Sequence, residues 1–500
     1  MPPILNRDAV IATALRIRGV EVRFVICDGA PVACILREVV SEQLPFLWGK
    51  KCPGCLRACA NEAASFNLPY DGIGELVSEE RRAELRVLAQ SVPADELATF
   101  RHLNVEVGQL AVSSTIRYFK GLSSEGHEDI VREYLYASLV NTEAAITAIA
   151  CFKPDCLVMT HACYVDYGTA QSVATNAGIP VVVWAGAYLE RHCYMNTKVP
   201  QSRNRSYQLL SAEAWRQRRE LHLTRREDER LDSYLNARYT TDVAFDLKLS
   251  SPPVAVDELR RKLDIPGNKP VWCIFAHVSW DDVFSYGAQA AFDTAELWFI
   301  DTIRTIMALP DVTWLVKLHP AEIPSGTVYG VQSLIEEHFP ELPHHVRLIP
   351  ADSDINVYGL YPVLDGGVTM FGTAGLEMAV LGKPVILAGE AHYGRKGFTY
   401  DAPTQEEYRA LLRRAAQLPK LSATQQALAR QYAYSYFIQR QIPLRMLERG
   451  YGGWGPLDYQ KLDLLLPGKD KALDMICEHI LEGGDFIMDE DMVAFYSALK

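Results

Sequence analysis

The sequence predicts an α/β protein with two domains, each built on a parallel β-sheet flanked by helices. Apolar runs of strand length alternate with segments of helical spacing in residues 154–187 and again in residues 271–389, a pattern typical of parallel sheets. A proline-containing segment, residues 246–268, separates the two series and marks a linker. The chain has 500 residues, 49% of them hydrophobic, which suffices for two domains of about 200–250 residues each.

The first predicted domain, residues 1–245, opens with a helix at residues 8–18 and a strand at residues 21–29. Residues 74–150 are mostly helical by spacing, and we interpret them as an insertion that shapes an acceptor pocket. Strand, helix and strand then follow one another within residues 154–187. Such a βαβ unit predicts a parallel sheet.

The second predicted domain, residues 269–450, has the same alternation, and residues 451–500 form a helical tail. Its expected strands and helices are residues 271–280, 294–308, 312–320, 331–339, 346–350, 355–367 and 384–389. Residues 429–450 mix aromatic residues with arginine, and we expect them to form a last helix that packs back onto the first domain. Docking of this stretch on a membrane surface is the alternative.

Composition limits the classes of function. A formal net charge of −12 argues against a nucleic-acid-binding protein, which would need a basic face. No uninterrupted apolar stretch has the length of a membrane span, and residues 1–10 lack the basic start and apolar segment of a signal peptide. We therefore expect a cytoplasmic protein, with attachment to the inner face of the membrane as an alternative. In that compartment the 11 cysteines are thiols or metal ligands rather than disulfides.

Two motifs in the second domain indicate a phosphate site. KLHP, residues 317–320, ends an apolar strand, and GTAG, residues 372–375, is a tight turn that opens a helix. Glycines let a backbone approach a ligand closely, and the N–H groups at a helix start attract phosphate. Lys317 and His319 add hydrogen-bond donors and positive charge. The alternative is an ordinary turn, with a buried histidine and a capping threonine.

Together, KLHP and GTAG resemble the donor half of GT-B glycosyltransferases, in particular the bacterial capsule and surface-polysaccharide transferases with an HP motif and a Ser/Thr motif. The resemblance is best over residues 271–399. It implies two Rossmann-like domains with a cleft between them, and transfer of a sugar from a nucleotide-activated donor to a glycan or lipid-linked acceptor. The KLHP motif resembles that of enzymes using CMP-activated acidic sugars (Kdo or sialic acid), with UDP and GDP left open. Enzymes of this fold need no divalent metal for catalysis.

The resemblance also assigns roles to individual residues. It implies that Glu377 binds the nucleotide ribose, and that the loop after residue 276 lines the donor side. The departing phosphate would be stabilised by the KLHP and GTAG residues. The expected donor-binding residues are His277, Ser279, Trp280, Asp281, Lys317, His319, Pro320, Gly372, Thr373, Ala374, Gly375 and Glu377.

An inverting transfer needs a carboxylate or histidine to take the proton of the acceptor hydroxyl. Asp166, Glu190 and His192 follow strands of the first domain and are equal candidates, while His319 is the catalytic candidate of the second domain. The related transferases carry an acidic-Gly motif where this chain has Ala185, so that motif does not identify the base. A retaining mechanism remains open.

A cysteine cluster predicts a structural metal site in the first domain. Cys52 and Cys55 form a CxxC motif, CPGC, and Cys27 with Cys34 would complete a tetrahedral zinc site. An iron–sulfur cluster is the second choice, and buried free thiols are the third.

Two other functions fit the same fold. One is a nucleotide-sugar 2-epimerase, which acts on the donor alone and needs no acceptor. The other is a non-catalytic sugar-binding or scaffold protein. Product analysis with the donor alone separates the transferase from the epimerase.

Overall fold

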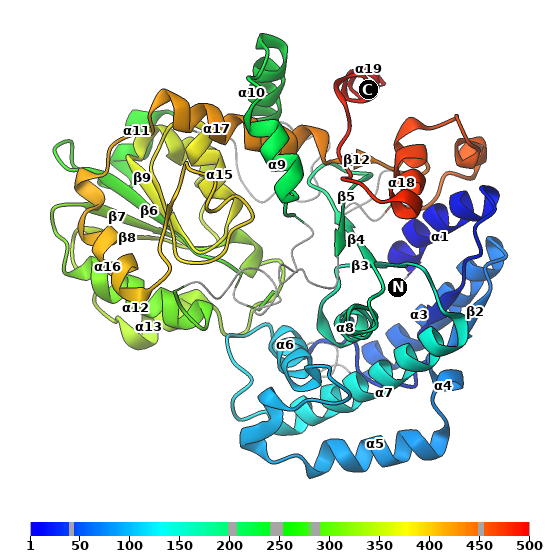
Figure 1. The fold of residues 1–500 in the computed structure, drawn as a ribbon. Helices are drawn as coiled ribbons and strands as arrows, with labels where there is room; N and C mark the ends of the chain where they lie inside the picture. Colours follow the sequence, from blue (N-terminus) through cyan, green and yellow to red (C-terminus); the bar gives the residue numbers. More distant parts are fainter. Residues whose placement is uncertain are drawn as a thin grey trace. The chain divides into compact units, whose positions relative to one another are not determined.

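The computed structural model describes residues 2–39, 45–198, 208–240, 254–278, 280–281, 291–448 and 455–499 (Figure 1). The chain divides into two compact units. The first comprises Met1–Phe119, Ser123–Gln208 and Gln439–Lys500, and the second comprises Lys120–Leu122 and Leu209–Ile438. Each unit contains a β-sheet with parallel strands and surrounding helices, which confirms the predicted α/β class.

The second unit is built on a six-stranded sheet in which all neighbouring strands are parallel. Its strands are β6 (Val271–Phe275), β7 (Thr313–Lys317), β8 (Val346–Ile349), β9 (Gly366–Thr369), β10 (Val385–Leu387) and β11 (Tyr400–Asp401). Their order is β11-β10-β9-β6-β7-β8. The chain therefore starts in the middle, builds one side, and returns to build the other. The direction of winding reverses between β6 and β9, and in such sheets ligands bind at the carboxyl ends of the strands beside that reversal.

Helices complete the second unit, with α12, α13 and α16 contributing to one apolar core against the sheet (Figure 1). Both faces of the sheet are covered, which explains why its strands read as continuous apolar runs. The helices are α9 (Ala212–Arg219), α10 (Arg225–Thr240), α11 (Val256–Lys262), α12 (Ala295–Met307), α13 (Val331–His338), α14 (Val357–Leu360), α15 (Thr373–Val380), α16 (Gln405–Arg413) and α17 (Ala423–Tyr434). The helix predicted at residues 294–308 is α12, and Thr294 caps it by accepting from the Leu297 N–H.

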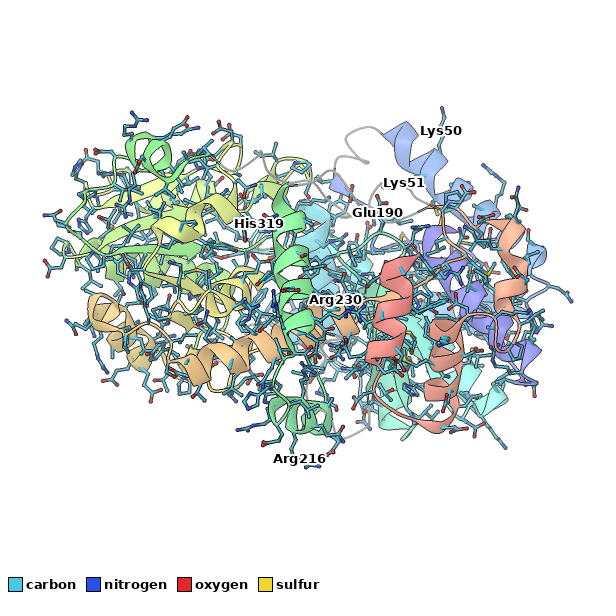
Figure 2. The ribbon with its side chains drawn as sticks, turned by 90° about the horizontal axis from the view of Figure 1, so that it is seen from above. Lys50, Lys51, Glu190, Arg216, Arg230 and His319 are labelled. Carbon is cyan, nitrogen blue, oxygen red and sulfur yellow. The ribbon has the colours of Figure 1, made fainter. Side chains whose placement is uncertain are left out.

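The boundary between the units differs from the linker predicted at residues 246–268, because α9 and α10 group with the second unit. Arg230 of α10 donates to the Tyr434 hydroxyl at 2.8 Å (Figure 2). Arg430 of α17 donates to the Asp228 carboxylate, also at 2.8 Å. The charged helix α10 thus has a side that packs on α17. Residues 241–253 lie outside the described part of the chain.

The end of α17 and the residues after it are the aromatic stretch predicted as a last helix. Tyr432, Tyr434, Tyr436 and Phe437 are fully buried. From Gln439 onward the chain belongs to the first unit. Residues 439–448 are therefore part of the first unit, although the sequence predicted them in the second domain. The aromatic side chains here form core rather than a surface for membrane docking.

The first unit has a four-stranded sheet of order β12-β5-β4-β3, with β3 (Leu157–Thr160), β4 (Val181–Gly186), β5 (His192–Lys198) and β12 (Ile442–Pro443). β3 and β4 are parallel and joined by α8 (Thr169–Asn176), as the βαβ pattern predicted. β5 is antiparallel to β4. The connection at residues 187–191 is too short for the crossover that a parallel neighbour would need. This sheet is therefore mixed.

The other elements of the first unit are mainly helical. They are α1 (Pro2–Ile17), β1 (Phe24–Ile26), α3 (Pro45–Ser65), β2 (Tyr70–Gly72), α4 (Ile73–Leu76), α5 (Glu79–Ser91), η1 (Ala94–Thr99), α6 (Val107–Phe119), α7 (Glu128–Phe152), η2 (Tyr164–Gly168), η8 (Tyr459–Leu465), α18 (Lys471–Glu482) and α19 (Glu490–Ala498). Helices fill most of the region predicted as a helical insertion. By length and composition α7 would suit a membrane span, but 56% of its most apolar window is buried inside the protein, and we interpret it as a core helix.

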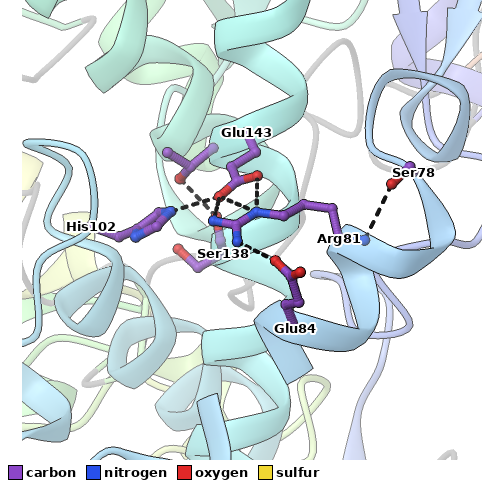
Figure 3. Close-up of polar contacts among 7 residues, drawn as sticks. Ser78, Arg81, Glu84, His102, Ser138 and Glu143 are labelled. Atoms are coloured by element: carbon purple, nitrogen blue, oxygen red, sulfur yellow. Dashed lines mark hydrogen bonds and ion pairs between the residues drawn. The ribbon is translucent and has the colours of Figure 1, made fainter. Parts of the chain in front are cut away.

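A polar network ties α5 to α7 within this helical region (Figure 3). The Arg81 guanidinium donates to both oxygens of Glu143, with the closest contact at 2.7 Å, and also to Glu84. His102 Nε2 lies 2.9 Å from the same Glu143 carboxylate. Ser78 caps α5 by accepting from the Arg81 N–H. The hydrogen bond from Arg81 is the main cause that lowers the pKa of Glu143 below its ordinary value of 4.5.

The lowered pKa of Glu143 predicts a loss of stability in acid. An acid with a depressed pKa stabilises the folded state above its unfolded pKa, and this contribution is lost as the pH falls through the folded pKa. Glu143→Gln should therefore lower the free energy of unfolding by roughly 1.5–3 kcal/mol at pH 7. The difference from wild type should shrink below pH 4.5. Urea unfolding at pH 7 and pH 3.5 measures it. Glu84→Gln, which removes an exposed partner of the same Arg81, is the matched control and should change stability by less than about 1 kcal/mol.

Candidate functional site

The carboxyl ends of β6 and β9, where the winding of the second sheet reverses, are joined by His277. Its Nε2 accepts from the N–H groups of Met370 and Phe371 at 3.2 and 3.3 Å, and lies 2.9 Å from the Thr369 hydroxyl. The imidazole also stacks on the Phe371 ring, with centroids 4.2 Å apart. Because Nε2 accepts from two backbone donors, the ring proton must be on Nδ1.

His319 follows β7, the other neighbour of β6 in the same sheet (Figure 2). Its Nδ1 accepts from the Ala321 N–H at 3.2 Å, so its proton is on Nε2. Pro320 occupies the first position of the short 3₁₀ turn that starts here, where the missing N–H of proline is harmless. The tetrapeptide thus presents a histidine with a fixed tautomer.

Both imidazoles of the site are neutral at pH 7. Burial, and to a smaller extent the charge of His319, lowers the pKa of His277 to about 3. Burial, and then the charge of Lys317, lowers the pKa of His319 to about 4, while Asp281 opposes this effect. We expected positive charge from His319. The structure instead gives uncharged hydrogen-bond donors, because removing an imidazolium from water is unfavourable.

Lys317 does not reach solvent as a phosphate clamp would. Its side chain is buried, with 4% exposure, and Nζ donates to the Leu318 carbonyl at 3.3 Å. Burial lowers the pKa of this ammonium group. The residue therefore lies in the sheet interior beneath the loop that carries His319.

The turn after β9 leads into α15 without a capping side chain. Gly372 is the N-cap residue, with extended backbone angles and no side-chain hydrogen bond, and Thr373 and Ala374 are the first residues of the helix. The Gly372 N–H donates to the Thr369 hydroxyl at 3.2 Å. A helix start without a capping side chain presents backbone donors and the positive end of the helix dipole, which suits a phosphate.

The two glycines of the GTAG turn make room for neighbouring side chains. A Cβ atom on Gly372 would lie 2.8 Å from His277 Cε1, and one on Gly375 would lie 2.2 Å from the Tyr393 hydroxyl. That hydroxyl donates to the Gly372 carbonyl at 2.5 Å. We expected these glycines to let a ligand approach, but the structure shows them packed against protein. The part played by Tyr393 was missed, because sequence separates it from the turn.

Glu377 faces the interior of the second unit. Its carboxylate is 2% exposed, accepts from the Tyr361 hydroxyl at 2.5 Å, and pairs with Arg238 of α10 at 3.5 Å. A carboxylate held in this way is not directed at a ribose. The sequence pattern placed Glu377 on the correct helix but could not show which face of α15 carries it.

The loop after β6 is only partly described, and Ser279 lies outside the described residues. Trp280 is buried, and its indole N–H donates to the Thr327 hydroxyl at 2.9 Å. The Lys120 ammonium lies 5.0 Å from the centre of the Trp280 ring. Asp281 is exposed, and its negative charge acts on His319, which places the two residues near each other.

Asp166 of the first unit lies beyond the carboxyl end of β3, in the π-helical turn η2. Its Oδ2 accepts from the Ile35 N–H at 2.9 Å, and burial raises its pKa to about 6. The residues leading to it, His161, Ala162 and Tyr164, have φ values of 53°, 59° and 58°. Left-handed backbone is strained for such residues and concentrates at functional sites, as do π-turns. The π-helical turn distinguishes Asp166 from Glu190 and His192, whereas Arg191 between those two residues is also left-handed, with a φ of 59°.

Glu190 and His192 flank the start of β5. The His192 Nδ1–H donates to the Glu190 carbonyl at 2.7 Å, and burial lowers the pKa of His192 to about 4. A base with so low a pKa is weaker than a carboxylate with a pKa near 6. The structure therefore ranks Asp166 above His192, whereas the sequence left the two equal.

Zinc binding by the four predicted cysteines stays a prediction, and the cysteines come in two pairs from different segments. Within the described ranges, which include all four, no group of three or more His, Cys, Asp or Glu side chains is arranged to hold a metal ion. Cys27 and Cys34 lie in the loop region after β1, whereas Cys52 and Cys55 lie within α3. The CPGC motif is thus part of a helix and not the turn between ligands that a zinc knuckle needs.

Part of the second unit is similar to a known protein family. Residues 274–439 match the family described as "Capsule polysaccharide biosynthesis protein". A search of curated protein sequences found no significant match. Three solved structures illustrate the structural similarity found. KpsC beta Kdo 2,4 transferase of Thermosulfurimonas dismutans has 14% identity and a TM-score of 0.32 over 53% of this chain and 75% of its own.

KpsC beta Kdo 2,7 transferase of the same organism has 14% identity and a TM-score of 0.33 over 58% of this chain and 79% of its own. UDP-GlcNAc 2-epimerase from Neisseria meningitidis has 12% identity and a TM-score of 0.26 over 86% and 93%. Similarity at this level supports no inference about this chain. The family match does support an inference, because the matched residues contain both the KLHP and the GTAG motif. Through residues 274–439, as the motifs predicted, the chain is similar to the capsule polysaccharide biosynthesis family.

Proposed function

We propose that this protein is a glycosyltransferase of capsule or surface-polysaccharide synthesis. It transfers a sugar from a nucleotide-activated donor to a glycan or lipid-linked acceptor. One observation carries the proposal. The start of α15 lies within the residues that match the family, and it has no capping side chain. It lies where the winding of the sheet reverses, next to His277, and His319 follows the neighbouring strand β7. This is where open α/β sheets bind ligands.

The donor phosphate fits these groups chemically. The N–H groups at the start of α15, the Nδ1–H of His277 and the Nε2–H of His319 are all hydrogen-bond donors with fixed orientation. Preorganised donors in a partly buried site stabilise the charge that develops as the nucleotide departs. Because the KLHP motif resembles that of transferases for CMP-activated acidic sugars, CMP is the favoured nucleotide.

Asp166 is our candidate for the base that accepts the proton of the acceptor hydroxyl. A general base works best when its pKa is close to the working pH, since it must be ionised and still basic. The pKa of about 6 that burial gives Asp166 meets this condition better than the pKa of about 4 of His192.

A thermal-shift panel of CMP, UDP, GDP and their sugar conjugates tests the donor site. A ligand at a hundredfold excess over its dissociation constant stabilises the native state by about 2.7 kcal/mol. We expect CMP or a CMP-sugar to stabilise wild type and to lose this effect in His319→Ala. His338→Ala, which removes an exposed histidine of the same unit, is the control and should respond like wild type. If no nucleotide stabilises wild type, the transferase proposal is wrong.

Product analysis with the stabilising donor distinguishes the rival functions. Release of nucleotide that depends on an added glycan acceptor supports the transferase. Epimerisation of the donor sugar at C2 without an acceptor would show that the protein is an epimerase and not a transferase. Binding of the donor without any turnover, over a panel of acceptors, would favour the scaffold protein.

A further inference from the structure

We propose that Ser114 of α6 and Asn141 of α7 act as positioning residues for Asp166. Both side chains hold the backbone of Val165, the residue directly before it. This inference rests on the proposed function, in which Asp166 accepts the proton of the acceptor hydroxyl. It gives a task to two helices that pack on each other within the region predicted as an insertion (Figure 1).

The backbone before Asp166 has a conformation that needs support from outside its own segment. His161, Ala162 and Tyr164 have φ values of 53°, 59° and 58°, and the π-helical turn η2 begins at Tyr164. Such left-handed conformations persist only where the surrounding structure fixes them. Cys163, the N-cap residue of η2, makes no side-chain capping hydrogen bond. The support for this turn therefore comes from neighbouring helices.

Both polar groups of the Val165 backbone are held by side chains. The Val165 N–H donates to the Ser114 hydroxyl at 3.1 Å. The Val165 carbonyl accepts from Asn141 Nδ2 at 2.7 Å and from the Thr169 hydroxyl at 3.1 Å. All four residues are less than a tenth exposed, so water competes little for these hydrogen bonds. We call the hydrogen bonds from Ser114 and Asn141 to Val165 the Val165 clamp.

Further contacts fix the part of η2 that follows the clamp. The Asp166 carboxylate accepts from the Ile35 N–H at 2.9 Å through Oδ2. Gly168 packs so closely on α6 that a Cβ atom there would lie 2.6 Å from Leu110 Cδ2. The backbone and the side chain of Asp166 are thus both held in one direction. A catalytic group needs such support, because small errors in its position cost much of its effect.

The hydrogen bonding of Asn141 indicates that stability alone does not explain this residue. Its Nδ2 must point to the Val165 carbonyl, because a carbonyl can only accept. Its Oδ1 is buried and has no hydrogen-bond partner among the described residues. A buried oxygen without a partner is unfavourable. An apolar side chain of similar size would avoid this penalty but would release the Val165 carbonyl.

Hydrogen exchange followed by mass spectrometry tests the Val165 clamp without any substrate. Ser114→Ala removes the acceptor of the Val165 N–H, and Asn141→Leu removes the donor to the Val165 carbonyl. Each variant should exchange roughly tenfold faster than wild type in a peptide covering residues 161–169, because this segment then opens more easily. Unchanged exchange in both variants would overturn the clamp.

Thr115→Val and Thr142→Val are the matched controls, one on each helix. These threonines are fully buried and directly follow Ser114 and Asn141, but their hydroxyls donate to backbone carbonyls of their own helices. Both controls should exchange like wild type over residues 161–169. Equally fast exchange in the controls would show that any change in α6 or α7 loosens η2, and would overturn the specific role of the clamp.

Steady-state kinetics test whether the Val165 clamp serves the reaction. Ser114→Ala should lower the turnover of glycosyl transfer by roughly 10–100-fold, since a displacement of about 1 Å can have this effect. The donor affinity should not change, because the candidate donor site lies in the second unit. In an Asp166→Asn background, Ser114→Ala should cause no further loss, because Ser114 acts through Asp166. Normal turnover in Ser114→Ala, or a full additional loss in the double variant, would overturn the positioning role.

The two measurements separate this inference from the proposed function. A wild type that binds no nucleotide and transfers no sugar contradicts the proposed function, and with it the catalytic purpose of the clamp. Faster exchange in Ser114→Ala and Asn141→Leu would still establish the clamp itself. An active wild type with equally active Ser114→Ala and Asn141→Leu contradicts this inference alone. Cooperative unfolding of each variant in urea shows that a loss of turnover is not a loss of the fold.

Discussion

Asp166→Asn should reduce the turnover of glycosyl transfer by roughly 10²–10⁴-fold while leaving the affinity for the donor nucleotide unchanged. An amide cannot take the proton of the acceptor hydroxyl, but its oxygen can still accept from the Ile35 N–H, so the fold around residue 166 is kept. Steady-state kinetics with the donor found in the binding panel measure the loss. Asp155→Asn, which changes an exposed aspartate just before β3, is the matched control and should have normal turnover.

The raised pKa of Asp166 adds a pH signature. Turnover in wild type should rise with pH through about 6, because the base must be ionised. Stability has the opposite sign: a carboxyl group with a raised folded pKa stabilises the protein below its unfolded pKa, and this is lost as the pH rises through the folded pKa. Asp166→Asn should therefore be more stable than wild type at pH 8, by up to about 3 kcal/mol, and gain little at pH 4.

A variant that is more stable and inactive is what a catalytic carboxylate with a raised pKa predicts. A purely structural Asp166 would give unchanged turnover after substitution by Asn. Retained activity in Asp166→Asn together with inactive Glu190→Gln would assign the base to Glu190 instead, and the strained backbone at residues 161–164 would then need another explanation.

The elements of the second unit were predictable because local chemistry and packing agree there. Strands such as β6 and β7 are buried along their whole length, so each appears in the sequence as a continuous apolar run. Thr294 marks the start of α12, and Gly382, with a φ of 76°, ends the segment that follows α15. In the first unit, by contrast, the direction of β5 depends on the length of a turn, which apolar periodicity does not report.

The sequence predicted which residues lie at the candidate site, but not their burial, charge or hydrogen-bond partners. Sequence placed His277 and His319 at strand ends, but their neutral state follows from burial, which depends on residues from other strands. Glu377 illustrates the same limit, because its partner Arg238 is distant in sequence. The CPGC motif fits a turn or a helix equally well, and only the extent of α3 decides between them.

Gly375→Ala should lower the free energy of unfolding by roughly 2–4 kcal/mol and weaken donor binding. The added Cβ would lie 2.2 Å from the Tyr393 hydroxyl, and this ring is fully buried and cannot swing into solvent. Overpacking a core costs about 1–3 kcal/mol, and the displaced hydroxyl leaves the Gly372 carbonyl without its 2.5 Å hydrogen bond. Because that carbonyl belongs to the N-cap of α15, the backbone donors for phosphate would shift with it. Urea unfolding and nucleotide titration measure both effects.

A double-mutant cycle with Tyr393→Phe separates this clash from a general intolerance of alanine. Removing the hydroxyl alone should cost about 0.5–1.5 kcal/mol, and it also removes the atom that the new Cβ would strike. The double variant should therefore be more stable than the sum of the two single changes predicts, by 1 kcal/mol or more, since contacting residues are not additive. Gly267→Ala, where a Cβ would meet nothing within 4 Å, is the control and should be close to neutral. Strict additivity would show that Gly375 is required for a reason other than Tyr393, such as the close approach of a ligand to the turn.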